Sequence, residues 1–233
     1  MVGRHVVFTL LIVCSSLCAE PKHLLLCGQG PDGHPPTTHE FMAGVQIIQH
    51  MLRDVPDLSI DIAQADEPWP EGPSRIDRSD GIVLFLTQGG QWMRRDPNRL
   101  AALERLAERK GGISAIHWAI GAKDAAFIET SLEFIGACHG GPDRKYVKSD
   151  QRVRVASADH PVARGLSDFD VHDEFYYRLK QTKLVPGVQP LLVTAIEGNE
   201  ELAAWTWDRP GGGRSFGFVG LHFHRNWERE VYR

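Results

Sequence analysis

A histidine stands where a buried run of the chain meets a turn. The stretch Gly111 to Gly121 contains a glycine pair, a short apolar run over residues 113–116, and then His117-Trp118. Enzymes with a helix-covered sheet often place a reactive side chain at such a turn, where small neighbours let the backbone bend sharply. Because that residue is usually serine or cysteine, His117 predicts proton transfer or metal binding instead. The alternative is a histidine that only caps the turn or packs in the core.

Two carboxylates and a tyrosine form a second candidate group. In Asp173-Glu174-Phe175-Tyr176, the residues Glu174 and Tyr176 are two apart, so on a strand both side chains point the same way. A carboxylate in a cleft near His117 could act as general acid or base. The alternative is a strand that starts in solvent.

Further histidines lie in loops. His34 and His39 belong to a glycine- and proline-rich loop, and His222 and His224 share one face if residues 222–224 are extended. With His117, such residues could bind zinc or a similar ion, although no HExxH or paired-cysteine spacing supports a metal. Neutral histidines that contact sugar hydroxyls would explain the same residues.

The first loop also contains the dinucleotide-binding spacing Gly28-x-Gly30-x-x-Gly33. That motif works when a helix begins within the glycines, so that its N-terminus meets the pyrophosphate. Here Pro31, Pro35 and Pro36 keep the loop extended, and Thr37 with Glu40 forms a capping-box pattern that starts the helix later. Nucleotide binding is therefore not expected.

The elements that must position these residues alternate between strands and helices. Apolar runs predict strands at 23–28, 58–63, 80–86 and 113–116. Helical spacing of apolar residues follows Phe41 and again Leu100. The second half is richer in strands, predicted at 152–156, 175–179, 190–195, 202–207 and 215–220. This order predicts one α/β domain with a mostly parallel sheet covered on both faces. Ligands of such sheets bind beyond the carboxyl ends of the strands, where His34, Gln88, His117 and His222 would meet.

The N-terminal segment reads as an export signal. Arg4 precedes an apolar run that is too short to span a bilayer. Small residues follow this run, as at a signal-peptidase site, and predict cleavage near Cys18 or Ala19. Residues 1–19 are thus assigned to a signal peptide and residues 20–233 to one domain. The formal net charge of −4, without a basic cluster, argues against nucleic acid and anionic membranes as partners. Cys27 and Cys138 remain, and their spacing leaves open whether they form a disulfide.

An ordered set of short motifs resembles a known family. The motifs are Ala-Ile-His117-Trp-Ala, Gly136-Ala-Cys-His139, Asp159-His160-Pro161, Asp173-Glu174-Phe-Tyr176, Ala204-Trp205, Gly213-Arg214 and Gly220-Leu-His222. Together they are similar to the ThuA-like (trehalose utilisation) family, from His23 onward. The resemblance implies a three-layer, flavodoxin-like sandwich related to class I glutamine amidotransferases, with histidine in place of their cysteine. It also implies a role in carbohydrate catabolism.

Two features depart from the family pattern. The family continues into a final helix, so either this helix is absent here or the sequence is a fragment of a longer chain. In addition, the segment from Gly136 to Gly141 carries Cys138 where the pattern has an aromatic residue, which puts the role of His139 in doubt.

The leading hypothesis is an exported enzyme that acts on a sugar or 3-keto-glycoside by lyase, hydrolase or isomerase chemistry. Its predicted catalytic residues are His117 and Glu174. The predicted contacts to a small carbohydrate substrate are His34, His39, Gln88, Trp118, Tyr176 and His222. If a divalent metal is bound, its candidate ligands are His34, His117, His222 and His224. The alternatives are a non-catalytic carbohydrate-binding module and, by fold analogy, a metal-dependent amide hydrolase.

Overall fold

A nine-stranded sheet forms the centre of the protein, whose computed structural model describes residues 20–232. Residues 1–19, with the predicted signal peptide, lie outside the described residues. The spatial order of the strands is β2 (Leu58–Gln64), β1 (Lys22–Gly28), β3 (Gly81–Phe85), β4 (Gly112–Ile116), β12 (Arg214–Phe218), β11 (Asn199–Asp208), β10 (Gln189–Ile196), β7 (Lys145–Val155) and β8 (Phe169–Tyr177). Each predicted strand is present, and β7 and β8 begin earlier than predicted.

The sheet is mixed, so the prediction of a mostly parallel sheet was wrong. Strands β2, β1, β3, β4 and β12 pair parallel, whereas β12, β11, β10, β7 and β8 pair antiparallel. Parallel neighbours need a long crossover, which the helices of the first half provide. From β10 to β12, consecutive strands are joined by short turns, which impose antiparallel pairing.

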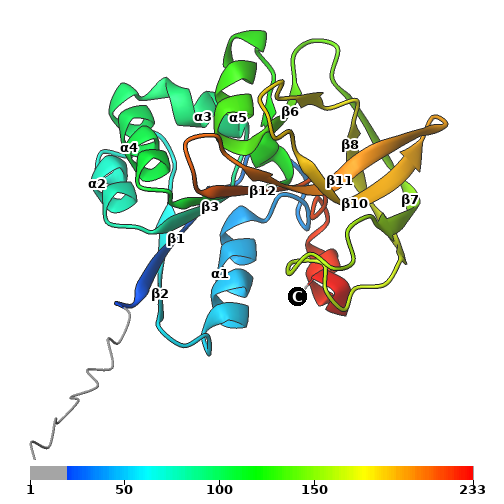
Figure 1. The fold of residues 1–233 in the computed structure, drawn as a ribbon, viewed down its shortest axis with the longest axis horizontal. Helices are drawn as coiled ribbons and strands as arrows, with labels where there is room; N and C mark the ends of the chain where they lie inside the picture. Colours follow the sequence, from blue (N-terminus) through cyan, green and yellow to red (C-terminus); the bar gives the residue numbers. More distant parts are fainter. Residues whose placement is uncertain (1–19, 233) are drawn as a thin grey trace, which may run out of the picture.

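Helices lie on both faces of this sheet and complete a three-layer α/β arrangement (Figure 1). One face carries α1 (Phe41–Leu52) with the short 3₁₀ turns η3 (His224–Glu228) and η4 (Glu230–Tyr232). The other carries α2 (Gly72–Asp77), α3 (Gly89–Arg95), α4 (Pro97–Glu108) and α5 (Ile128–Ile135). The sequence predicted α1 and α4. The other three helices have six to eight residues, too few for a clear apolar period.

Alternation along the central strands divides the core between the two faces. On β1, Leu25 and Cys27 pack beneath α2 to α5, whereas Leu26 packs with Val45 of α1. Cys27 and Cys138 are both buried and free, so these two cysteines form no disulfide. The tryptophans Trp92, Trp205 and Trp207 are also buried in the core.

The helix α1 starts later than the capping-box pattern predicts. Its N-cap is Glu40, whose side chain does not cap the helix. Instead, Glu40 Oε1 accepts a hydrogen bond of 2.9 Å from the amide of Thr37. Only half of the reciprocal pattern forms. The loop before α1 is not extended as expected but closes a turn, in which the amide of Thr38 donates to the carbonyl of Pro35 at 3.2 Å.

A small three-stranded sheet lies beside the large one. It consists of β5 (Gly121–Ala122), β6 (Ala137–Gly140) and β9 (Lys180–Gln181), and β6 carries His139. None of the helices in residues 20–232 is long and apolar enough to cross a membrane.

Candidate functional site

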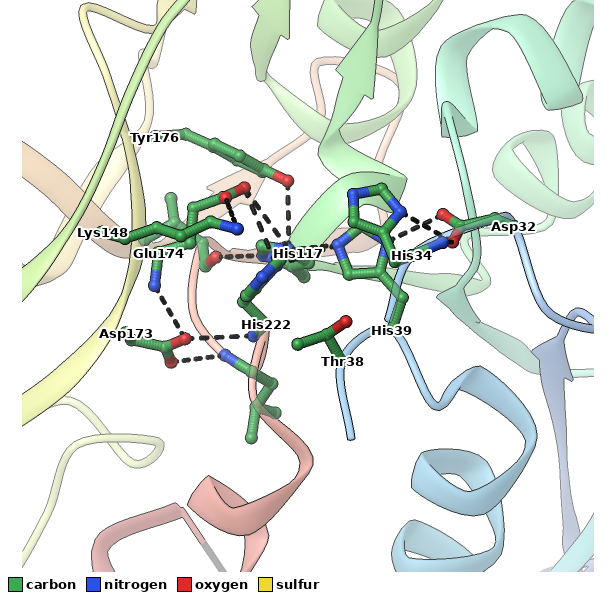
Figure 2. A network of polar contacts seen from close by, with 12 residues as sticks. Asp32, His34, Thr38, His39, His117, Lys148, Asp173, Glu174, Tyr176 and His222 are labelled. Atoms are coloured by element: carbon green, nitrogen blue, oxygen red, sulfur yellow. Dashed lines mark hydrogen bonds and ion pairs between the residues drawn. The ribbon is translucent and has the colours of Figure 1, made fainter. Parts of the chain in front are cut away.

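Three segments far apart in the sequence meet at the carboxyl ends of the central strands. His39 lies in the loop between β1 and α1, His117 begins the turn η1 (His117–Ile120) after β4, and His222 follows β12. This confirms that residues beyond different strands gather at one rim. Figure 2 shows the three imidazole rings pointing toward one another.

The three histidines form a closed triangle of nitrogen atoms. His39 Nε2 lies 3.0 Å from His117 Nε2 and 3.0 Å from His222 Nδ1, and the third side, between His117 Nε2 and His222 Nδ1, is 3.1 Å. All three side chains are buried. The remaining ring nitrogens of His39 and His117 point outward to acceptors. His39 Nδ1 lies 2.7 Å from Asp32 Oδ2, and His117 Nδ1 donates to the carbonyl of Val219 at 2.7 Å.

The backbone brings these rings together at some conformational cost. His39 and His117 both have a φ of 52°, a left-handed conformation that residues other than glycine rarely adopt. Such strain persists only where neighbouring structure enforces it. Here the amide of His39 donates to the carbonyl of His222 at 3.1 Å, and Thr38 forms a β-bridge with Phe223. These backbone bonds tie the first loop to the C-terminal segment.

A carboxylate and a phenol line one side of the triangle. Glu174 Oε1 lies 3.9 Å from His117 Nε2 and 3.8 Å from His222 Nδ1. The hydroxyl of Tyr176 lies 3.1 Å from His117 Nε2. As predicted for residues two apart on a strand, Glu174 and Tyr176 of β8 point the same way. Lys148 of β7, which pairs with Glu174 across the two strands, reaches Glu174 Oε2 at 3.3 Å.

Two aspartates hold the histidines in position, Asp32 through ring nitrogens and Asp173 through backbone amides. Asp32 contacts His34 Nδ1 at 2.8 Å as well as His39. Burial alone would raise the pKa of Asp32, but hydrogen bonds and charge from His39 and a hydrogen bond from His34 lower it to about 2. Asp173 is fully buried and accepts hydrogen bonds from the backbone amides of residues 174, 221 and 222. Asp173 therefore holds the chain around His222 in place.

Burial determines the protonation of the site. It lowers the pKa of His117 well below the usual range, and His39 and His222 lower it further. Burial likewise lowers the pKa of His222 to about 3. For Tyr176, burial raises the pKa well above 10, and Glu174 adds to the effect, so Tyr176 remains a neutral hydrogen-bond donor. His117 and His222 are therefore neutral near pH 7, with lone pairs available as ligands.

Tyr176 is held between two rings. It stacks on His117 with ring centroids 4.8 Å apart and on His139 at 3.9 Å, with interplanar angles of 16° and 4°. Trp118 lies beside this stack, tilted by 57° against the ring of Tyr176, with ring centroids 5.8 Å apart. The hydroxyl group of Tyr176 is thereby directed at the triangle.

A cavity of about 350 Å³ borders the site at Asp32, His34 and His39. Its volume lies within the range of small-molecule pockets. The side chain of His34, about two fifths exposed, lines this cavity together with His39, and the two ring centroids are 3.7 Å apart. A small molecule in the cavity would therefore contact His34 and His39.

A comparison with known protein families identifies the family of this chain. A family model described as trehalose utilisation, ThuA, matches residues 33–233. The chain belongs to the ThuA family. Its matched region contains all three histidines of the triangle and Glu174, but not Asp32. No curated protein sequence matches the chain significantly.

Solved structures show the same fold. A ThuA-like protein from Bacteroides uniformis superposes with a TM-score of 0.68 at 14% identity, over 98% of this chain and 90% of the other. A ThuA-like protein from Parabacteroides merdae gives 0.61 at 17% identity, over 86% and 79%. A cytoplasmic protein from Salmonella typhimurium also gives 0.61, at 14% identity, over 91% and 94%. At these identities the likeness shows a ThuA fold and nothing more.

The structure brings most of the predicted site residues of this ThuA domain together. His117, Glu174, His39, Tyr176 and His222 meet in one cluster. His34 lies at its rim, and Trp118, next to His117 in the chain, packs on Tyr176 and His139.

Two predicted residues lie elsewhere. The side-chain oxygen of Gln88 accepts a hydrogen bond of 3.2 Å from the amide of Lys123, so Gln88 braces a turn. His224 does not share a face with His222, because residue 224 begins η3 and the segment is not a continuous strand. Among the described residues, the groups suited to a metal are His39, His117 and His222, and Asp32, His34 and His39, neither with His224.

Sequence reasoning missed the part played by Lys148 and left that of His139 in doubt. Lys148 reaches Glu174 only because β7 extends to Lys145 and pairs with β8 in a register that no motif encodes. The valines at 147, 153 and 155 lie an even number of residues apart, as on one face of a strand, and this spacing could have predicted a longer strand. His139 lies on a strand of the small second sheet, from which its ring stacks on Tyr176. The strands of this sheet are too short to give a recognisable sequence pattern.

Proposed function

We propose that this ThuA domain is an enzyme that acts on a sugar or a 3-keto-glycoside, with Glu174 as the group that takes up and returns the proton. The observation that carries the proposal is the position of Glu174. Its buried carboxylate lies within 4 Å of two neutral histidines and is ion-paired to Lys148. The family description, trehalose utilisation, supports a carbohydrate as the substrate.

The chemistry follows from the acidity of a keto-sugar. A C–H bond beside a carbonyl loses its proton to a base when the carbonyl oxygen is stabilised as negative charge develops on it. In a 3-keto-glycoside, Glu174 would remove the proton from C2, the C1–C2 double bond would form, and the glycosidic C1–O bond would break. The departing oxygen takes a proton, so that an unsaturated keto-sugar and a free alcohol result.

The histidines have a different part in this proposal from Glu174. His117 donates its Nδ1 proton to a backbone carbonyl at 2.7 Å, and burial keeps the ring neutral. A ring fixed in this way presents the lone pair of Nε2 to the site and exchanges protons with solvent poorly. Because a lone pair cannot donate to a substrate oxygen, we assign the polarisation of that oxygen to the neutral hydroxyl of Tyr176, which His117 helps to position.

A time course of NMR spectra tests the proposal. Residues 20–233 would be incubated with 3-keto-trehalose and with 3-keto-glucosides, and loss of the keto-sugar signals would be compared with that of a Glu174→Gln variant. Loss of substrate with the wild type and not with the variant is the expected result, and the product spectrum identifies the reaction. Equal rates for both proteins would overturn the assignment of Glu174.

The other hypotheses predict different outcomes in the same experiment. A carbohydrate-binding module would broaden the ligand signals without forming product, both in the wild type and in Glu174→Gln. An amide hydrolase would leave keto-sugars intact and cleave amide substrates. Export, predicted from residues 1–19, is part of the proposal and is tested by fractionating cells that produce the full chain.

A further inference from the structure

The histidine triangle contains a nitrogen–nitrogen contact that no hydrogen atom bridges when the rings are neutral. A backbone carbonyl can only accept, so His117 must carry its proton on Nδ1, and its Nε2 is then a bare lone pair. Asp32 Oδ2 lies 2.7 Å from His39 Nδ1, and a carboxylate oxygen that accepts there likewise holds the proton of His39 on Nδ1. With both rings neutral, two lone pairs face each other across the 3.0 Å between His39 Nε2 and His117 Nε2.

The neighbouring donors do not resolve this contact. Tyr176 can donate to His117 Nε2, and His222 Nδ1 can donate to one further nitrogen, but neither places a hydrogen between His39 and His117. A proton on His39 would do so, at the cost of a charged ring in a buried cluster. A cation at the centre of the triangle satisfies all three nitrogens at once.

We infer that His39, His117 and His222 bind one divalent transition-metal ion of the zinc type through Nε2, Nε2 and Nδ1. The sides of the triangle, 3.0, 3.1 and 3.0 Å, fit such an ion. Metal–nitrogen bonds of about 2.0–2.1 Å at angles between octahedral and tetrahedral place their nitrogens about 2.8–3.4 Å apart. Three imidazoles favour zinc, copper, iron or nickel over magnesium or calcium.

The surroundings of the triangle match those of a metal centre. A histidine ligand usually donates its second ring N–H to a carboxylate or a carbonyl, which fixes the tautomer and aims the lone pair. His39 does so to Asp32 (Figure 2), and His117 does so to the carbonyl of Val219. The resulting ligand set differs from the sequence expectation, because His39 takes the place of His34 and His224.

One side of the centre stays open toward Glu174 and Tyr176. Glu174 Oε1 lies 3.8 and 3.9 Å from two ligand nitrogens, farther than the spacing expected between two ligands of one ion. Glu174 is thus placed to contact a water molecule or substrate oxygen on the ion rather than the ion itself. What the ion does in a reaction rests on the proposed function, whereas its binding does not.

Metal binding is measured directly. Wild-type residues 20–233, stripped with a chelator, would be titrated with Zn²⁺ by calorimetry, and the bound zinc would be counted by mass spectrometry and examined by X-ray absorption. One equivalent of zinc with three imidazole nitrogens is the expected result. His39→Ala, His117→Ala and His222→Ala should each weaken binding at least about 100-fold, and His224→Ala, the matched control, should bind like the wild type.

Other results would overturn the inference. These are a wild type that takes up no zinc at micromolar concentrations, as a protonated His39 would give, or unchanged affinity in the three alanine variants. If an alanine variant fails to fold, Asp32→Asn serves in its place, with an expected loss of 10–100-fold, and unchanged affinity there counts against the site. A Glu174→Gln variant that keeps its zinc separates the two proposals. Zinc binding without turnover overturns only the proposed function, and turnover by a protein that takes up no zinc overturns only this inference.

Discussion

His39 and His117 are 78 residues apart in the chain, yet their Nε2 atoms lie 3.0 Å apart. One residue precedes the first helix and the other follows the fourth strand. The parallel pairing of β1 with β3 and of β3 with β4 carries their loops to the same end of the sheet. The bond between the His39 amide and the His222 carbonyl adds the third histidine, because it ties the loop of His39 to the segment that carries His222.

Replacement of Tyr176 by phenylalanine should lower activity and leave the fold unchanged. The phenol donates to the cluster, whereas stacking on His139 at 3.9 Å needs only the ring. We expect kcat on the keto-glycoside to fall about 10–100-fold, with a melting temperature close to that of the wild type. Tyr176→Ala, which also removes the stack, should be less stable by about 3–5 kcal/mol. A Tyr176→Phe enzyme with full activity would show that the hydroxyl is dispensable.

Loss of the Asp32 carboxylate should loosen His39. Asp32→Asn keeps the shape of the side chain and removes the charge that fixes the tautomer of His39. The NMR signals of the His39 ring should shift and broaden, and the population of the Nδ1–H tautomer should fall. Asp66→Asn is a suitable control, because Asp66 accepts from Gly30 in the same loop without touching a histidine. Identical spectra of His39 in both variants would contradict the role given to Asp32.

The contribution of Asp173 to the free energy of unfolding should fall as the pH rises, which is the opposite of the usual behaviour of a carboxyl group. Burial raises its pKa from 3.8 to about 6, against hydrogen bonds from the amides of Leu221, Glu174 and His222 and the side chain of Asn226 that lower it. The folded protein therefore holds this proton more tightly than the unfolded chain. The contribution is fully present below the unfolded pKa and is lost as the pH rises through about 6.

Urea unfolding of the wild type and of Asp173→Asn measures this effect. From about pH 4.5 to about pH 7.5, the wild type should lose about 2 kcal/mol of unfolding free energy relative to the variant. The comparison removes the titration of groups that both proteins share. A difference that grows in favour of the wild type with rising pH would show that the hydrogen bonds outweigh burial.

Gly89 should tolerate no side chain. A Cβ atom there would lie 1.9 Å from the carbonyl oxygen of Ala119, in the turn that begins with His117. Because a backbone atom must move, Gly89→Ala should cost about 1–3 kcal/mol and disturb the turn. Gly112→Ala is the matched control, since a Cβ atom at Gly112 in β4 would meet nothing within 4 Å. Equal stabilities of the two variants would contradict this account.

The sequence alone located most of the strands, two of the helices and several of the candidate site residues. Apolar runs located β1 to β4, and the apolar spacing after Phe41 located α1, because these patterns reflect burial on one face and are local. It also identified His117, His222 and the Glu174–Tyr176 pair, since parallel strands place their carboxyl ends at one rim and residues two apart on a strand share a face.

Only the tertiary structure decided how these residues combine. The antiparallel half of the sheet sets the register that brings Lys148 to Glu174, and register depends on pairing between distant strands. The same holds for the choice of His39 over His224, because residue 224 turns into η3 while a backbone bond carries residue 39 to residue 222. A triangle with sides near 3 Å is a property of three loops packed together, which no single segment specifies.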